Sequence, residues 1–190
     1  MKLIEFFKKF WQPILGMLGV YILFGAYMND FYLRPHRAPV AIAWTAAYES
    51  PEKFAVLKEA FYPLPVTVEP FVFGGDVPLD VERLAYFATL VHSWSLDIVI
   101  GDFVHNEETG AAGIRMTSYE MLMDLRPVFA AADVTLSGAE IRGGMAVSLE
   151  GNRFLSDLGF DTDGLYLGVF DNNRREARIH QLLRVLWDAA

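Results

Sequence analysis

A run of nineteen residues without a charge extends from Phe10 to Met28 and reads FWQPILGMLGVYILFGAYM. In a helix, which rises 1.5 Å per residue, this run is about as long as the ~30 Å hydrocarbon layer of a bilayer is thick. Trp11 lies near one end and Tyr27 near the other, and such amphipathic rings are favoured at membrane interfaces. The run therefore predicts a transmembrane helix over residues 10–28.

The basic residues in front of this run also fit a cleaved signal peptide, because Lys2, Lys8 and Lys9 precede the apolar stretch. Signal cleavage requires small residues at two recognition positions, and the exit sequence LFGAYMND matches that requirement poorly. The chain has no cysteine, which excludes a lipid-modified cysteine and a disulfide framework. We therefore expect an uncleaved signal anchor, so that the helix itself holds the protein in the membrane.

The flanking charges predict the orientation. Three lysines precede the span, whereas Arg34 and Arg37 follow it, a small bias that favours a cytoplasmic N-terminus. We expect a short cytoplasmic N-terminus over residues 1–9, the anchor over 10–28, a stalk over 29–37 and an extracytoplasmic domain over 38–190. The localisation expected is the cell membrane, with a single span.

The charge of the domain excludes one class of partner. Residues 1–37 carry a net charge of +3, which leaves −11 for the rest of a chain whose total is −8. An acidic domain repels phosphate backbones, so we expect no nucleic-acid partner.

The first half of the domain alternates strand and helix patterns. VAIAW at 40–44 predicts a strand, and Ser50-Pro51-Glu52 then predicts a helix with an N-cap serine. PVTVEPFVF at 65–73 predicts an outer strand, because its internal proline has no N–H to donate. A second helix, with Asp80 as its N-cap, carries an apolar stripe at helical spacing: Leu84, Phe87, Ala88, Val91 and Trp94.

A third strand follows in LDIVIGDF at 96–103, where Asp102 stands near the strand exit. Thr117 to Glu120 form a capping box ahead of a short helix that we expect to end before Pro127. Strand candidates at 144–149 and 164–170 precede a closing helix with an apolar face of Ile179, Leu182, Leu183 and Leu186. These patterns predict a three-layer α/β domain with a mostly parallel sheet.

The order of these pieces resembles one lobe of the type II extracellular (periplasmic) solute-binding proteins, as in small membrane-anchored proteins of Firmicutes. Three segments carry the resemblance, which covers about residues 38–190: DIVIGDF, LMDLRPVF and GLYLGVFDNNRREARIHQLLRVLW. The resemblance implies a binding module that works beside a transporter permease. One departure is that only the fourteen residues EGNRFLSDLGFDTD separate the last two strands, too few for a second lobe. A ligand would therefore occupy an open half-cleft or be covered by a partner.

Ligands of parallel α/β sheets bind beyond the carboxyl ends of the strands. The candidate ligand-binding residues there are Trp44, Tyr48, Asp76, Asp102 and His105. The aromatic rings would stack on a sugar or a cation, and the aspartates would accept its hydrogen bonds. The alternative is that Trp44 packs in the core and the aspartates cap helices or turns.

The sequence gives little support for a metal site or for catalysis. Asp102, His105, Glu107 and Glu108 are the densest set of metal-ligand types, yet they fit a solvated acidic loop better than a metal site. Hydrolase motifs and a phosphate-binding glycine loop are missing. We therefore expect no enzyme activity, no cofactor and no metal.

Two functions remain open. The first is a membrane-anchored extracytoplasmic binding or adaptor module, solute-binding-like and associated with a transporter permease or another membrane protein. The second is a structural interaction subunit of a membrane complex that has no small-molecule ligand.

Overall fold

The structure, a computed structural model, describes residues 11, 17–28, 38–47, 49–71, 81–105, 112–117, 119–136, 140–171 and 175–188. The chain divides into two compact units, residues 1–38 and residues 39–190. The predicted N-terminal segment 1–9 and the predicted stalk 29–37 lie outside the described residues, as do positions 10 and 12–16 of the predicted span.

The described part of the first unit is a helix over residues 17–28. Eight large hydrophobic side chains of this helix are exposed, from 51% for Tyr27 to 77% for Met17. In the described part of the chain, no helix combines the length and the apolar character that crossing a membrane requires.

The second unit is an α/β domain built on a mixed seven-stranded sheet. The strands have the spatial order β2-β1-β3-β7-β6-β5, with β4 paired to the far part of β3. Their bounds are β1 Val40–Trp44, β2 Val66–Pro70, β3 Ile98–His105, β4 Ala112–Ile114, β5 Ile141–Arg142, β6 Ala146–Ser148 and β7 Leu165–Val169.

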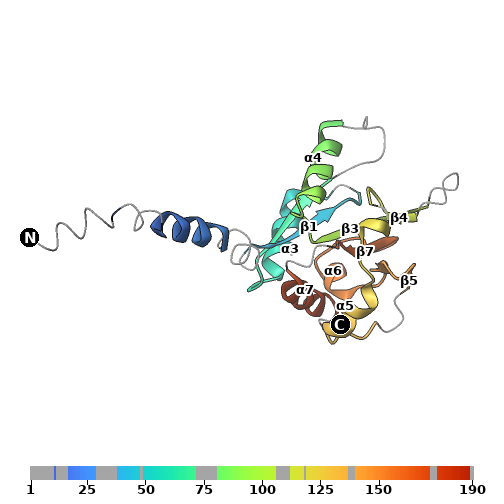
Figure 1. The fold of residues 1–190 in the computed structure, drawn as a ribbon. Helices are drawn as coiled ribbons and strands as arrows, with labels where there is room; N and C mark the ends of the chain where they lie inside the picture. The colour runs from blue at the N-terminus through green and yellow to red at the C-terminus, as the bar shows by residue number, and fades with distance from the viewer. Residues whose placement is uncertain are drawn as a thin grey trace, which may run out of the picture. The chain divides into compact units, whose positions relative to one another are not determined.

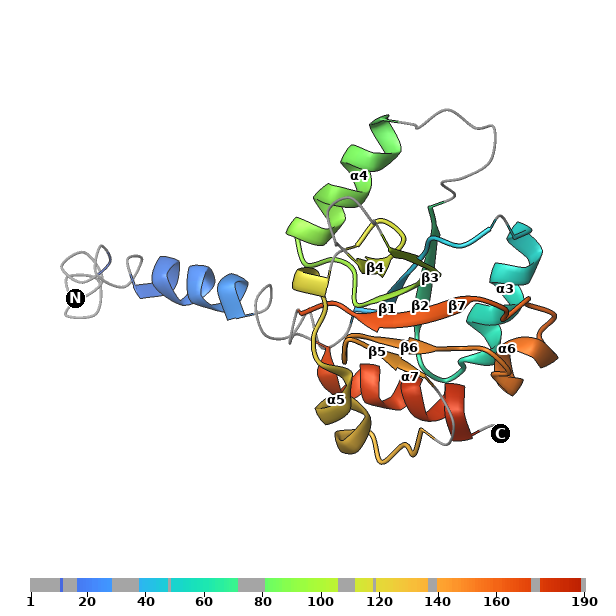
Figure 2. The ribbon, with the colours of Figure 1, turned by 90° about the vertical axis from the view of Figure 1, so that its right-hand side faces the viewer.

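Helices cover both faces of this sheet, which makes three layers (Figures 1 and 2). One face packs against α3, α5, α6 and α7, and the other packs against α4 and the segment around β4. Their bounds are α3 Pro51–Ala60, α4 Val81–His92, the 3-10 helix η2 Tyr119–Met121, α5 Leu125–Ala131, α6 Arg153–Asp157 and α7 Glu176–Asp188.

The prediction of an α/β domain is confirmed, but the prediction of a mostly parallel sheet is wrong. β1 is parallel to both β2 and β3, whereas β7, β6, β5 and β4 pair antiparallel to their neighbours. A tight turn through Gly143 and Gly144, both with positive φ, joins β5 to β6. Between β6 and β7, α6 has five residues, a length of about 8 Å that is too short to return the chain along a strand.

Several local predictions are confirmed. β1 and α3 begin at the predicted residues, and the Ser50 hydroxyl caps α3 by accepting from the Lys53 N–H at 3.4 Å. The strand that contains Pro70 lies at the edge of the sheet, as its missing N–H predicts. All four apolar residues predicted for the face of α7 are buried.

The predicted helix between Thr117 and Pro127 is found only as the three-residue 3-10 helix η2, and the prediction that the helix ends before Pro127 is wrong for α5. Pro127 is the third residue of α5, whose N-cap Asp124 accepts from the Arg126 N–H at 3.0 Å. A proline in the first turn leaves no hydrogen bond unmade, because the first N–H groups of a helix have no partner within it. Thr117 does not cap a helix here, and its hydroxyl donates to the Ile114 carbonyl at 2.8 Å.

The apolar stripe predicted to end at Trp94 is too long. Helix α4 ends at His92, and Trp94 lies beyond it with a φ of 57°. The Ser95 N–H donates to the Leu90 carbonyl and the Trp94 N–H to the Val91 carbonyl, which together form a Schellman motif.

The ends of α5 and α6 have the same hydrogen-bond pattern, with Asp133 and Gly159 in the left-handed position. Glycine adopts this conformation freely and aspartate tolerates it, whereas for other residues it costs about 1–2 kcal/mol. A tryptophan at this position, as in α4, is therefore unusual.

Small residues line the sheet face under α4. Ala41, Ala43, Gly101, Ala146 and Gly168 alternate along their strands with large residues on the opposite face. A Cβ at Gly101 would lie 1.9 Å from Thr45 Oγ1, so the Thr45 side chain requires a glycine at position 101.

We predict that Gly101→Ala costs more stability than Gly168→Ala. The added methyl group at Gly101 collides with the buried Thr45, and such overpacking costs about 1–3 kcal/mol. At Gly168 the nearest atoms are the flexible ends of Leu122 and Ile114, at 2.9 and 3.0 Å. Urea unfolding of the two variants measures the difference, and adding Thr45→Ala to the first should recover part of its loss. Equal losses would contradict the prediction.

Candidate functional site

The sheet has one topological switch point, between β1 and β3. The chain leaves β1 through α3 to β2 on one side and returns through α4 to β3 on the other. A crevice at the carboxyl ends of such strands is the usual ligand site of this architecture. Here Thr45 is fully buried beyond β1, with its hydroxyl 3.4 Å from the Ile100 carbonyl, and Gly101 packs against it.

Trp44 is part of the core. Its side chain is 1% exposed, and its ring lies 5.6 Å from that of Phe54 and 5.0 Å from that of Phe160. The indole N–H donates to the Ala47 carbonyl at 3.2 Å. Trp44 therefore packs in the core, as the alternative to a ligand-binding role describes. This placement leaves no ring face open to a ligand.

Asp102 is paired within the domain. Its carboxylate lies 2.8 Å from Arg115 Nη2, and the two side chains are about one-third exposed. The sequence places Asp102 at the strand exit, but β3 continues to His105 because Phe103, Val104 and His105 pair with β4. Asp102 therefore lies within a strand.

The other candidate residues are less fully described. Tyr48 and Asp76 lie outside the described residues, and His105 is described only as the last backbone position of β3. Their assignment to a ligand site stays a prediction. Within the described ranges, no group of three or more histidines, cysteines or acidic residues is placed to hold a metal, and Glu107 and Glu108 lie outside those ranges.

A cluster of aromatic and charged side chains lies on the α4 side of the sheet, toward β5. The Arg142 guanidinium sits 4.5 Å from the ring centre of Phe103 and 4.9 Å from that of Tyr166. Arg142 also donates to both carboxylate oxygens of Glu140, at 3.1 and 3.3 Å. The Tyr166 hydroxyl donates to the same carboxylate at 3.1 Å. We call these four residues the Arg142 cluster.

The hydrogen bonds of the Arg142 cluster shift two pKa values. Those from Arg142 and then from Tyr166 hold the pKa of Glu140 below its ordinary value. Burial, followed by the hydrogen bond to Glu140, raises the pKa of Tyr166. Both shifts favour an ionised Glu140 and a protonated Tyr166 at neutral pH, the states in which Tyr166 donates to Glu140 and Glu140 pairs with Arg142.

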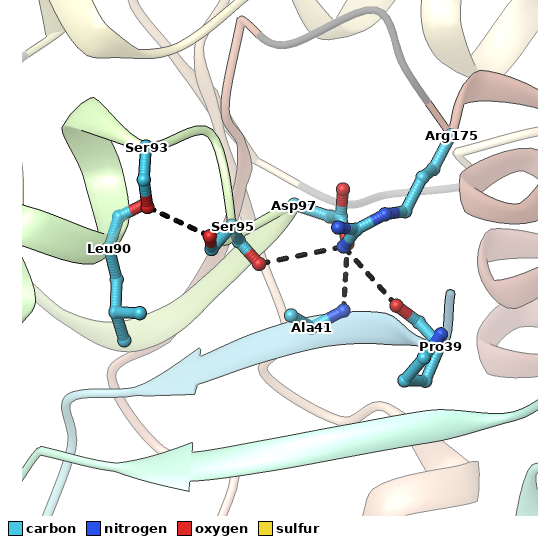
Figure 3. A network of polar contacts seen from close by, with 7 residues as sticks. All are labelled: Pro39, Ala41, Leu90, Ser93, Ser95, Asp97 and Arg175. Atoms are coloured by element: carbon cyan, nitrogen blue, oxygen red, sulfur yellow. Dashed lines mark hydrogen bonds and ion pairs between the residues drawn. The ribbon is translucent and has the colours of Figure 1, made fainter. Parts of the chain in front are cut away.

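The best-buried polar network lies at the opposite end of the sheet (Figure 3). The Asp97 carboxylate is fully buried, accepts from the Ala41 N–H at 2.7 Å and pairs with Arg175 Nη1 at 2.5 Å. The same guanidinium nitrogen reaches the carbonyls of Pro39 and Ser95, at 3.2 and 3.5 Å. This network joins the starts of β1, β3 and α7.

Sequence reasoning missed both polar groups. Asp97 interrupts an apolar run, LDIVI, and a charge within a buried strand is the signal that could have revealed a buried ion pair. Its partner follows 78 positions later and carries no local signal. The residues of the Arg142 cluster lie in separate parts of the sequence, and only the fold brings them together.

The described groups can stabilise the fold and form a contact surface. Each carboxylate described above has a basic partner within the domain, at Arg115, Arg142 or Arg175. In comparisons with known proteins, no family model, curated protein or solved structure matches this chain.

We predict that Asp97→Asn destabilises the domain by about 3–5 kcal/mol, because it leaves the Arg175 charge buried without its counter-ion. The matched control is Asp102→Asn, which removes a half-exposed ion pair and should cost about 1 kcal/mol or less. The free energies of unfolding in urea measure both values. A similar small loss in the two variants would show that the Asp97 pair is not a structural requirement.

Proposed function

We propose that this chain is a membrane-anchored extracytoplasmic adaptor module, in which the N-terminal segment holds the α/β domain at a membrane beside another membrane protein. The observation that carries the proposal is the helix over residues 17–28, which is apolar all round and exposed. A helix of this kind is stable when it is buried in lipid or in protein. Transfer of each large apolar side chain from water contributes about 1.5–3 kcal/mol, so its eight exposed members favour burial strongly.

The polar groups of the domain favour an adaptor over a solute-binding protein. At the carboxyl end of β1, Thr45 is buried and Trp44 is in the core, and within the neighbouring β3 Asp102 pairs with Arg115. A binding site for a polar solute needs convergent groups that are available to the ligand. Each of these described groups already has a partner within the domain.

Helix α4 supports a role in contacts with a protein. Of its twelve residues, all of them described, Phe87 alone is buried, while Val81 is 70% and Tyr86 50% exposed. Tyrosine and exposed apolar side chains are frequent at protein interfaces. A transporter permease or another membrane protein is the partner class that a membrane-held domain would meet.

We expect the full chain to float with phosphatidylcholine liposomes in a density gradient. The double substitution Ile22→Lys with Phe24→Glu should abolish flotation, because it places two charges among the exposed apolar side chains without changing the net charge. Val56→Lys, at an exposed apolar position of α3, is the matched control and should float like the unmodified chain. Flotation of the double variant, or sedimentation of the unmodified chain, would refute the anchoring.

We also expect the domain to be accessible from outside the cell. The chain has no cysteine, so Ser156→Cys on the exposed surface of α6 introduces a single thiol. Asn152 is unsuitable because its side chain caps α6 and donates to the Leu186 carbonyl at 2.9 Å. A membrane-impermeant maleimide should label Ser156→Cys on intact cells and should not label the buried control Leu155→Cys. Labelling of Ser156→Cys only after lysis would place the domain in the cytoplasm.

A further inference from the structure

The N-terminal segment enters the domain at β1, the central one of the three parallel strands. Pro39 immediately precedes β1, and β1 lies between β2 and β3 in the sheet. The segments that lead into β2 and β3 therefore flank the entry point. The Val40 N–H donates to the Pro65 carbonyl on one side, and the Asp97 N–H donates to the Ala41 carbonyl on the other.

Each flanking segment carries an exposed aromatic residue. Tyr62, between α3 and β2, is 85% exposed, and Trp94, between α4 and β3, is 51% exposed. Both helices run back along the sheet, so both residues lie at the end where the chain enters. Tyrosine and tryptophan are the side chains enriched where the lipid headgroups meet water.

The buried ion pair fixes Trp94 relative to the entry point. Arg175 Nη1 contacts the carbonyl of Pro39 and the carbonyl of Ser95, the residue after Trp94 (Figure 3). Because this guanidinium also pairs with the buried Asp97, the backbones at Pro39 and Ser95 are held to a common centre. Trp94 is therefore next to the attachment point of the N-terminal segment.

The backbone at Trp94 gives an independent argument. This residue closes α4 in the left-handed conformation, at a φ of 57°, where Gly159 closes α6. Folding alone favours a small residue at that position. A strained backbone under an indole that is 51% exposed fits the use of strained residues at functional positions.

We propose that Tyr62 and Trp94 rest in the headgroup region of a lipid bilayer and turn this end of the domain toward the membrane. The inference rests on the proposed anchoring. Residues 29–38 separate the helix over residues 17–28 from Pro39 and can span about 40 Å at most, which limits how far the entry point can lie from the end of that helix. The domain carries a net charge of −11, so a zwitterionic lipid is the favoured surface.

Quenching of tryptophan fluorescence by brominated phosphatidylcholine tests this contact. The full chain with Trp11→Phe retains three tryptophans, of which Trp44 is in the core and Trp187 packs against Phe129 on the α7 side. Lipid brominated close to the headgroup should quench the emission of Trp94, one tryptophan of three. The second variant adds Trp94→Gly, which suits the left-handed backbone and should leave the melting temperature at or above that of the parent.

The outcomes separate the two proposals. Flotation with quenching that disappears on adding Trp94→Gly supports the contact. Flotation with no quenching, or with the same quenching in both variants, overturns the contact and leaves the anchoring intact. Absence of flotation overturns the anchoring and, with it, the contact.

Discussion

The buried ion pair between Asp97 and Arg175 is the constraint on which the rest of the domain depends. A carboxylate with no exposed surface is tolerated only when its charge is compensated and its lone pairs are used, and here a guanidinium and the Ala41 N–H do both. The pair joins three elements that are far apart in the sequence: the start of β1, the start of β3 and the start of α7. It thereby sets the register of two neighbouring strands and anchors the closing helix beside them.

The two faces of the sheet carry side chains of different size. Large residues such as Trp44 and Leu167 fill the space under four helices, whereas alanines and glycines face the side that α4 covers. The contact between Gly101 and Thr45 shows the consequence, because a Cβ at Gly101 would collide with the Thr45 hydroxyl. The buried Thr45 side chain, packed over Gly101 just beyond β1, occupies the place where this topology ordinarily leaves a crevice.

Local signals predicted local structure well, and long-range pairing poorly. Ser50 and Pro51 predicted the start of α3, and the spacing of Ile179 to Leu186 predicted the buried face of α7. The antiparallel half of the sheet was missed because β4 and β5 have three and two residues, too few for a periodicity to show. The candidate site depended on which strands become neighbours, and so Asp102 was placed at a strand end without its Arg115 partner.

The described ion pairs at the two ends of the parallel strands differ in burial. Toward the end of the sheet where β1 finishes, Asp102 and Arg142 are paired and about one-third exposed, which suits contact with water or with a protein. At the amino ends the charge of Asp97 is neutralised in the interior, and the exposed side chains include Tyr62 and Trp94. Burying that ion pair therefore joins the strands at the end where the chain enters the domain without placing the charge of Asp97 on the surface.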